Sequence, residues 1–384
     1  MDDIVYLDHG ATSWPKPPQV VDAVADALAE YGGNPGRGAH RLALATARMI
    51  HGARRDLAGF LGVDDARDLL FQPGCTQALN LMLRGLIAPG DRVVTTSIEH
   101  NAVARPLNLL AREGVDVVVV AADETGTVSA QAIAAALAQA PTRAVVFQHA
   151  SNLTGAIQPV AEIVAAAHAA GALALVDGAQ AGGHLDVQLS SLRVDAWACS
   201  GHKGMLGPQG IGVLYLAPDC RPAPLVTGGT GGGSSADAQQ PDVRPDRYEA
   251  GTPNTPGIAG LGAAARFLAQ DADVQRAEER RLARRLHEGI LAIGGFRVLG
   301  PGPDVPRVPI VSAVHERLDA DRLAFVLDRE WGVAVRAGLH CAPWAHESLG
   351  TAATGALRFG VGWRNTDAHI ETALSALARL VGEA

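Results

Sequence analysis

The feature that most constrains the fold is an alternation of short apolar runs with longer alanine-rich stretches between residues 68 and 216. The runs are rich in Val, Ile and Leu, and the stretches between them carry apolar residues at helical spacing. Continuous apolar runs are typical of a parallel sheet that helices cover on both faces. The predicted strands are DLLF (68–71), RVVTTS (92–97), VDVVVVA (115–121), RAVVFQ (143–148), ALALVD (172–177), DAWACS (195–200) and IGVLYL (211–216).

The alternation stops after residue 220 and indicates a division of the chain. A stretch rich in Pro and Gly at 221–257 is typical of a domain boundary. A long charged helical stretch, several short strands and a closing amphipathic helix follow. We therefore predict an α/β fold with a large domain at 15–257 and a smaller α+β domain at 258–384, against which residues 1–14 pack.

Composition limits the partners of the chain. A net charge of −8 over 384 residues argues against nucleic acid or an anionic membrane as the main partner. The N-terminal MDDIVYLDHG lacks the pattern of a secretory signal, and no run of about 18 apolar residues predicts a membrane span. We expect a cytoplasmic protein whose anionic ligands would need a local basic site.

The four cysteines are far apart and must be interpreted one by one. Neither a disulfide framework nor a metal site is predicted, because C-x-x-C, H-x-x-x-H and H-E-x-x-H spacings are absent. Cys199 lies in an apolar run and is predicted to be core, and Cys220 is predicted in a surface loop. Cys341, in GLHCAP between two turns flanked by Gly and Pro, is predicted in an exposed loop.

Two strand ends carry a pair of residues suited to one cofactor. Asp177 ends the run ALALVD, and Lys203 follows the run DAWACS in the loop SGHKG. Ligands of parallel sheets bind beyond the carboxyl ends of the strands, so both side chains would face one crevice. Pyridoxal phosphate needs a lysine for covalent attachment and a carboxylate at its pyridinium nitrogen. Taken alone, Asp177 could cap a helix and Lys203 could be a solvated loop residue.

Two further strand ends fit the same cofactor. Gly74-Cys75-Thr76 follows DLLF and precedes a helix, so Thr76 and nearby backbone N–H groups could cap the helix and hold a phosphate. A simple capping threonine explains this segment equally well. His100 follows RVVTTS, where its imidazole could stack on a pyridine ring, although a lone histidine is more often structural.

Together, eight segments resemble a known family. They are YLDHGAT, GNPGRGAHRLA, SIEHN, SNLTG, DGAQA, SGHKG, RYEAGTPNTPG and RAGLHCAP, in family order from residue 6 to 343. The chain resembles the cysteine desulfurase branch of the class V aminotransferases, in particular the type that carries its sulfur-accepting cysteine in R-x-G-x-H-C-A and includes selenocysteine lyases. The resemblance implies fold type I, with a mostly parallel seven-stranded sheet in the large domain.

The resemblance also implies roles for individual residues. Lys203 would hold the cofactor and act in catalysis with Cys341 and His100, which would stack on the ring. The remaining cofactor contacts would come from Asp177, Gln180, Cys75, Thr76, Ser200, His202 and Asn152, with Thr252 supplied by a second subunit. The substrate would meet Arg358 at its carboxylate, together with Asn152, Arg336 and His9.

The implied reaction transfers sulfur from L-cysteine to Cys341 as a persulfide and releases L-alanine. His340 or Arg336 could favour the thiolate by charge. The implied assembly is a homodimer with shared sites that passes sulfur to an acceptor protein. Selenocysteine lyase or another pyridoxal-phosphate C–S lyase stays open as an alternative, because His9-Gly10 departs from the family pattern. So does a class V epimerase or aminotransferase in which Cys341 is not catalytic.

Overall fold

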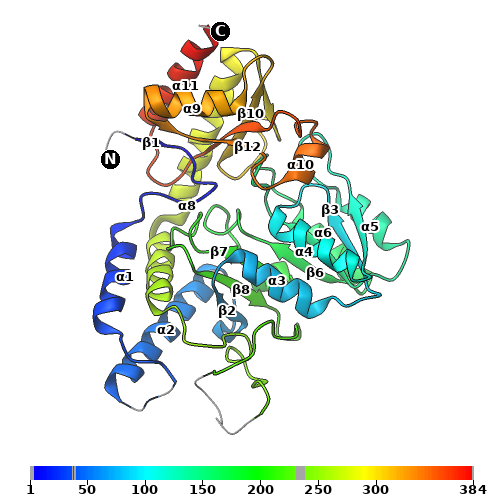
Figure 1. Ribbon diagram of the computed structural model, residues 1–384, viewed down its shortest axis with the longest axis vertical. Coiled ribbons are helices and arrows are strands. Elements are labelled where there is room, and N and C mark those ends of the chain that lie inside the picture. Colours follow the sequence, from blue (N-terminus) through cyan, green and yellow to red (C-terminus); the bar gives the residue numbers. More distant parts are fainter. Residues whose placement is uncertain (1–3, 37, 39, 231–237, 383–384) are drawn as a thin grey trace.

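A computed structural model describes residues 4–36, 38, 40–230 and 238–382 (Figure 1). Part of the stretch predicted as a domain boundary, residues 231–237, lies outside the described residues. The described chain forms a large sheet with helices on both faces and a smaller sheet at one end (Figure 1).

All seven predicted strand segments lie in one sheet, in the spatial order β2-β8-β7-β6-β5-β3-β4. Strand β8 is antiparallel to both of its neighbours, whereas the pairs from β7 to β4 are parallel. The predicted mostly parallel sheet is therefore confirmed. Its strands are β2 (Leu69–Gln72), β3 (Arg92–Thr96), β4 (Asp116–Val120), β5 (Ala144–Gln148), β6 (Leu173–Asp177), β7 (Ala196–Ser200) and β8 (Gly212–Leu216).

Helices cover both faces of this sheet, so its inner strands are mostly apolar and are buried at every position except Leu173. On one face pack α3 (Cys75–Leu86) and α4 (Asn101–Arg112). On the other face pack α2 (Arg41–Phe60), α5 (Ala130–Leu137), α6 (Val160–Ala169) and α7 (Leu189–Leu192). The short 3₁₀ helix η1 (Ala66–Asp68) leads into β2, and the edge strand β4 is partly exposed.

The second sheet is antiparallel and has the strand order β12-β13-β10-β9. Its strands are β9 (Phe296–Leu299), β10 (Ile310–His315), β12 (Arg336–Gly338) and β13 (Ala356–Gly360). Helices α9 (Ala320–Trp331) and α11 (Asp367–Gly382) share its apolar core. Near it, β1 (Val5–Tyr6) pairs in parallel with β11 (Val333–Ala334), and α10 (Pro343–Ser348) follows β12.

One long helix joins the two cores. Helix α8 (Thr255–Ile293) packs its first half, with Ile258 and Leu268, into the core of the large sheet, beside α1 (Pro18–Glu30). Its second half, with Leu282 and Ile290, lies in the core of the small sheet. The backbone leaves helical geometry at Asp271, between the two halves. The domain limits at 257 and 258 remain a prediction.

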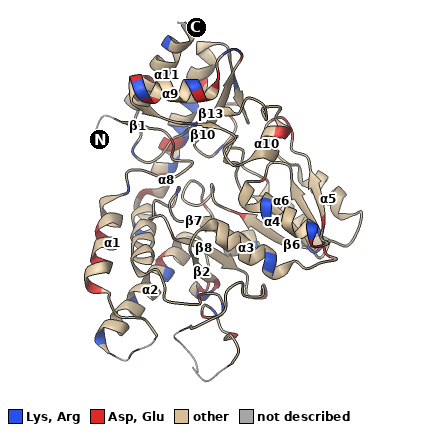
Figure 2. Ribbon diagram, in the orientation of Figure 1, with Lys and Arg blue, Asp and Glu red and all other residues tan. Residues whose placement is uncertain are grey.

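Charge is mixed over the outer helices, and the central strands are mostly uncharged (Figure 2). Within the part of the chain that the structure describes, no helix has the length and apolarity needed to cross a membrane. The strand ends that carry Asp177 and the Lys203 loop open toward the small sheet, and the segment after β12 reaches them there: the Asn101 N–H donates to the Cys341 carbonyl at 2.7 Å. The candidate site therefore lies between the two sheets.

Candidate active site

The base of the site is a carboxylate and an amine at neighbouring strand ends. Asp177 is the last residue of β6 and is buried, and its Oδ1 accepts a hydrogen bond from the Ala179 N–H at 2.9 Å. Cys75 Sγ lies 3.5 Å from the same oxygen. Burial raises the pKa of Asp177 and lowers the pKa of Lys203, and the attraction between the two charges opposes both shifts. The predicted pair is therefore brought together.

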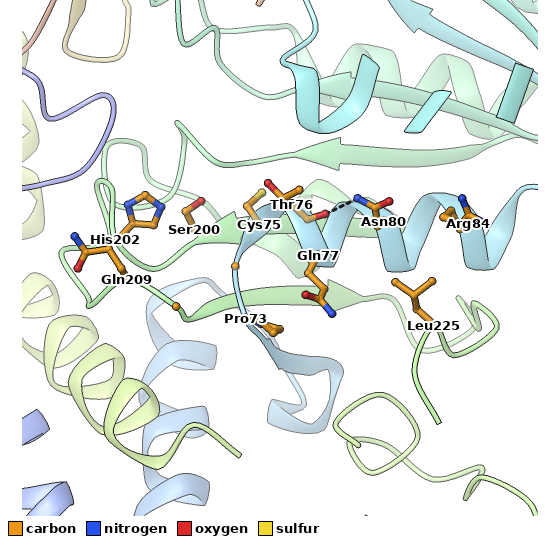
Figure 3. A pocket seen from close by; sticks show the side chains of 12 residues that line it. Pro73, Cys75, Thr76, Gln77, Asn80, Arg84, Ser200, His202, Gln209 and Leu225 are labelled. Carbon is orange, nitrogen blue, oxygen red and sulfur yellow. Dashed lines mark hydrogen bonds between the residues drawn. The ribbon is translucent and has the colours of Figure 1, made fainter. Parts of the chain in front are cut away.

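A cavity of about 570 Å³ opens at the start of α3 (Figure 3). Cys75 and Thr76 begin the helix there, with Ser200 and His202 beside them (Figure 3). The N-cap is Gly74, and no side chain caps the helix, so the first backbone N–H groups are left for an anion. The prediction that Thr76 caps this helix is wrong, because Thr76 is its second residue and is exposed.

His100 lies next to this base and is uncharged at neutral pH. It is the N-cap residue of α4, where its Nδ1 accepts a hydrogen bond from the Ala102 N–H at 3.0 Å. Burial, followed by repulsion from Lys203 and Arg336, lowers its pKa to about 3. A neutral ring fixed by its cap bond suits the predicted stacking on an aromatic cofactor.

Two buried amides and a guanidinium leave polar atoms without partners in this region. Gln180 donates to the Gly10 carbonyl at 2.9 Å, and Asn152 donates to the His340 carbonyl at 2.8 Å. Among the described residues, Gln180 Oε1, Asn152 Oδ1 and Arg358 Nε have no hydrogen-bond partner. An unpaired buried polar atom costs about 1–3 kcal/mol, so a polar ligand would complete the site. The residues present thus fit a phosphorylated aromatic cofactor and an amino acid.

Arg358 lies on β13 and reaches the site from the small sheet. Its side chain is 1% exposed, Nη1 donates to the Asn152 carbonyl at 3.1 Å, and Nη2 pairs with Asp8 Oδ1 at 2.8 Å. Asp8 was not among the predicted site residues, and its only signal is its place in YLDHGAT. A Cβ atom on Gly10 would lie 3.3 Å from the guanidinium carbon, so the glycine leaves room for this side chain.

Cys341 lies on an exposed turn between β12 and α10, as predicted. His340 and Cys341 have positive φ angles of 51° and 56°, a backbone conformation that residues other than glycine seldom adopt. Asn101 holds this turn by a hydrogen bond from its N–H to the Cys341 carbonyl, in addition to the bond from Asn152. Arg336 Nη2 lies 3.5 Å from Cys341 Sγ and places a positive charge beside the sulfur.

His340 cannot supply that charge, so this part of the prediction is wrong. Burial, with repulsion from Arg358, lowers its pKa to about 2. His340 Nε2 lies 3.3 Å from the Arg336 carbonyl, which can only accept, so Nε2 carries the proton. His340 Nδ1 then accepts from His346 Nε2 at 3.4 Å, and His346 Nδ1 accepts from the Thr351 hydroxyl at 2.7 Å. Of the two predicted groups, Arg336 is the one that places a charge beside the sulfur.

Two predicted site residues do not join this group in a single chain. The His9 ring packs edge-on against Tyr6, with centroids 5.0 Å apart, and lies close to Gly362. Burial lowers the pKa of His9 to about 3, and Gly10 rather than His9 faces Arg358. Thr252 is exposed and lines a neighbouring cavity, which shares Gln77 with the cavity at the start of α3.

A second carboxyl group lies behind the base and was also not predicted. Glu99 is fully buried, its Oε1 accepts from Thr96 Oγ1 and from the Gln148 N–H at 3.1 Å, and its Oε2 has no partner among the described residues. Burial, with repulsion from Asp177, raises the pKa of Glu99 to about 8. Glu99 is therefore mostly protonated at neutral pH.

Comparison with known proteins gives a consistent result. Residues 5–372 match the family Aminotransferase class-V. A protein of Methanothermobacter thermautotrophicus named as a probable cysteine desulfurase is 36% identical, over 99% of this chain and 95% of its own length. A cysteine desulfurase of an Enterobacter species is 35% identical over 88% and 84%. The apo structure of a cysteine desulfurase from Thermococcus onnurineus superposes with a TM-score of 0.93 at 32% identity, covering 100% of this chain and 96% of that one.

Proposed function

Since the chain belongs to the class V aminotransferase family, we propose that it is a pyridoxal-phosphate-dependent cysteine desulfurase that moves sulfur from L-cysteine to Cys341. The observation that carries the proposal is the pairing of an exposed thiol beside Arg336 with the Lys203–Asp177 base across one site. The thiol would have no role in an enzyme that only moves protons or amino groups.

The cofactor would be held by residues of both strand ends and of α3. Lys203 would bind it covalently, Asp177 would face its ring nitrogen, and the first turn of α3 with Ser200 and His202 would take its phosphate. When bound, pyridoxal phosphate withdraws electrons from the substrate Cα. The buried Gln180 Oε1 and the neutral His100 ring are the groups left to fix its orientation.

The residues of this chain then have separable tasks. Arg358 would grip the substrate carboxylate, which Asp8 now mimics at Nη2. Lys203 Nζ, whose pKa burial lowers, would take the proton from Cα. The Cys341 thiolate would attack the substrate sulfur, forming an S–S bond while the Cβ–S bond breaks and its electron pair goes to Cβ. Protonation of Cβ, and return of a proton to Cα from Lys203, would then give alanine.

We also propose the assembly expected from the resemblance. Thr252 lies outside the cavity at the start of α3 in its own chain, so a second copy would have to supply it to the phosphate. Sulfur on Cys341 would pass to an acceptor protein, and the protein would act in the cytoplasm. An acceptor protein is not needed for the first transfer of sulfur, which ends on Cys341.

The test is the substitution Cys341→Ser. We expect release of alanine from cysteine to fall to background, because no thiol remains to take the sulfur, while the visible absorbance of the bound cofactor persists. The matched control is Cys220→Ala, which removes a buried thiol from the turn after β8 and should leave turnover unchanged. Both variants are assayed with alanine and sulfide quantified together.

The same assay distinguishes the alternatives. Unchanged turnover by the Cys341→Ser variant would contradict the proposal and favour an epimerase or aminotransferase. Selenocysteine and cysteine sulfinate, offered beside cysteine, show which leaving atom the site accepts. A preference for selenocysteine would make the protein a selenocysteine lyase with the same residues in place.

A further inference from the structure

The chain contains two lysines in 384 residues, Lys16 and Lys203, whereas the other 30 of its 32 basic residues are arginine. Arginine therefore supplies almost all of the positive charge in Figure 2. Lysine differs from arginine in having a compact ammonium head that can lose its proton. Lys203 needs that property for the proposed chemistry, which raises the question of what Lys16 does.

Lys16 reaches the loop that carries Lys203. Its Nζ donates to the carbonyl of His202 at 3.0 Å and to Ser13 Oγ at 2.6 Å. That carbonyl belongs to the peptide that joins His202 to Lys203. The two lysines of the chain thus meet on one peptide, although 187 positions separate them in the sequence.

Other donors of the N-terminal segment converge on the same carbonyl. The Ser13 N–H donates to it at 2.8 Å, and the hydroxyl groups of Ser13 and Thr12 each lie 3.1 Å from it. A carbonyl oxygen has two lone pairs, so this oxygen is surrounded by more donors than it can bind at full strength. Only Lys16 among these donors carries a charge, and bonds from charged donors are the stronger ones.

The charge on Lys16 is held without an anionic partner. Burial alone lowers its pKa to about 8, and no carboxylate of the described residues pairs with its Nζ. The titratable groups that face it are His9 and His202, whose pKa values burial lowers to about 3 and about 4. Both are neutral above pH 6, so a change of charge around pH 8 comes from Lys16 or from Glu99, the other group of the site whose pKa is about 8.

We propose that Lys16 is a positioning residue of the cofactor site, which fixes the peptide before Lys203 through its protonated amine. The segment Thr12–Lys16 then acts as a clasp on the Lys203 loop. Loss of the proton would leave Lys16 a weaker donor and loosen the clasp. The inference rests on the proposed function only in requiring that pyridoxal phosphate binds at Lys203.

The experiment measures how fast the holoenzyme loses its cofactor, followed by visible absorbance across about pH 6.5 to 9.5. In the wild-type protein we expect the rate to rise as the pH passes about 8. Lys16→Met should lose the cofactor about tenfold faster at neutral pH, because a charge-assisted hydrogen bond is gone. Its rate of cofactor loss should show no rise near pH 8. Lys16→Arg keeps a charge at every pH and should also show no such rise.

The controls separate a local role from general damage. Arg297→Met removes an exposed basic residue on β9 and should behave as wild type. Circular dichroism and thermal unfolding of the apo proteins report whether each variant folds. A rise in the rate near pH 8 that survives in both Lys16 variants would belong to another group, such as Glu99, and would overturn the proposal, as would an unchanged rate in Lys16→Met. Wild-type protein that binds no cofactor would instead refute the proposed function.

Discussion

The two halves of the site are built in different ways. In the base, Asp177 and the Lys203 loop lie at the ends of β6 and β7, whose register is fixed by backbone ladders on both sides, and α3 starts at the end of the edge strand β2. The thiol turn, residues 340–342, belongs to no ladder. It is held in a left-handed conformation by single hydrogen bonds from Asn101 and Asn152 and by the chain through His346.

This difference sets what each half can tolerate. A buried strand end cannot move without breaking several hydrogen bonds and the packing of the sheet, so its side chains keep their places. A turn held by single bonds, each worth about 0.5–1.5 kcal/mol, can adjust its sulfur with little loss of stability. Substitutions in the base should therefore abolish chemistry or change stability strongly, and substitutions of the residues that hold the turn, as distinct from Cys341 itself, should change rates by modest factors.

The largest effect on turnover is expected at Lys203, the reactive residue at the strand ends. Lys203→Ala should reduce alanine release by more than about 10³-fold, because both covalent attachment and the proton acceptor are lost. Lys203→Arg should not restore activity, since guanidinium keeps its proton. The comparison fails if Lys203→Ala retains turnover. It also fails if Cys341→Ser loses the cofactor as completely as Lys203→Ala does, because the two halves would then not be separable.

A smaller effect concerns the second carboxyl group of the base, Glu99. Its pKa in the folded chain, about 8, exceeds its ordinary value of 4.5, so the folded state keeps a proton that the unfolded state releases. The contribution of Glu99 to wild-type stability should fall as pH rises from about 4.5 to 8, by roughly 1.4 kcal/mol for each pH unit in this interval, whereas the buried histidines contribute alike to wild type and variant. Glu99→Gln cannot lose a proton, so this fall should be absent from its unfolding free energy.

Urea unfolding of both proteins at a series of pH values measures this difference directly. Glu347→Gln, at an exposed carboxyl group on α10, provides the matched control and should run parallel to wild type. A constant offset between Glu99→Gln and wild type at every pH would mean that Glu99 is ionised in the folded base.

The smallest effect sharpens the description of the thiol turn. Thr351→Val removes the hydroxyl that donates to His346. We expect this change to weaken the hydrogen bond from His340 Nε2 to the Arg336 carbonyl. We expect alkylation of Cys341 by iodoacetamide to slow by about threefold to tenfold, the factor that one hydrogen bond is worth. Thr351→Ser keeps the donor and should react at the wild-type rate.

The measurement is specific because the other three cysteines are at most 5% exposed. Equal alkylation rates in Thr351→Val and Thr351→Ser, with the cofactor absorbance intact in both, would show that the histidine chain does not position Arg336.

The same contrast explains what could be predicted from the sequence. Apolar runs mark buried parallel strands, and polar residues just after them must lie at one edge, so the Asp177–Lys203 pair follows from periodicity and chemistry. The cap of α3 was assigned to Thr76 because capping favours threonine, but the chain enters this helix through Gly74 with φ 158°.

The burial of single side chains outside the strands could not be predicted from apolar periodicity. His340 was expected to lend charge to Cys341, yet it is 2% exposed and neutral. Cys220 follows β8, but the prediction that it lies at the surface is wrong, because it is 4% exposed and belongs to the same apolar cluster as Tyr248. Asn101 and Asn152, which hold the thiol turn, lie about 190 to 240 positions from it, a distance that no local pattern spans.

The distribution of the cysteines has a consequence for the fate of the transferred atom. Cys75, Cys199 and Cys220 are enclosed by protein, and Cys341 is the one thiol that solvent reaches. A sulfane group formed there would meet no neighbouring thiol able to resolve it into an internal disulfide without unfolding. The sulfur would stay on the exposed cysteine until an external nucleophile attacks it. The rate of sulfur transfer would then depend on how often that molecule meets the enzyme.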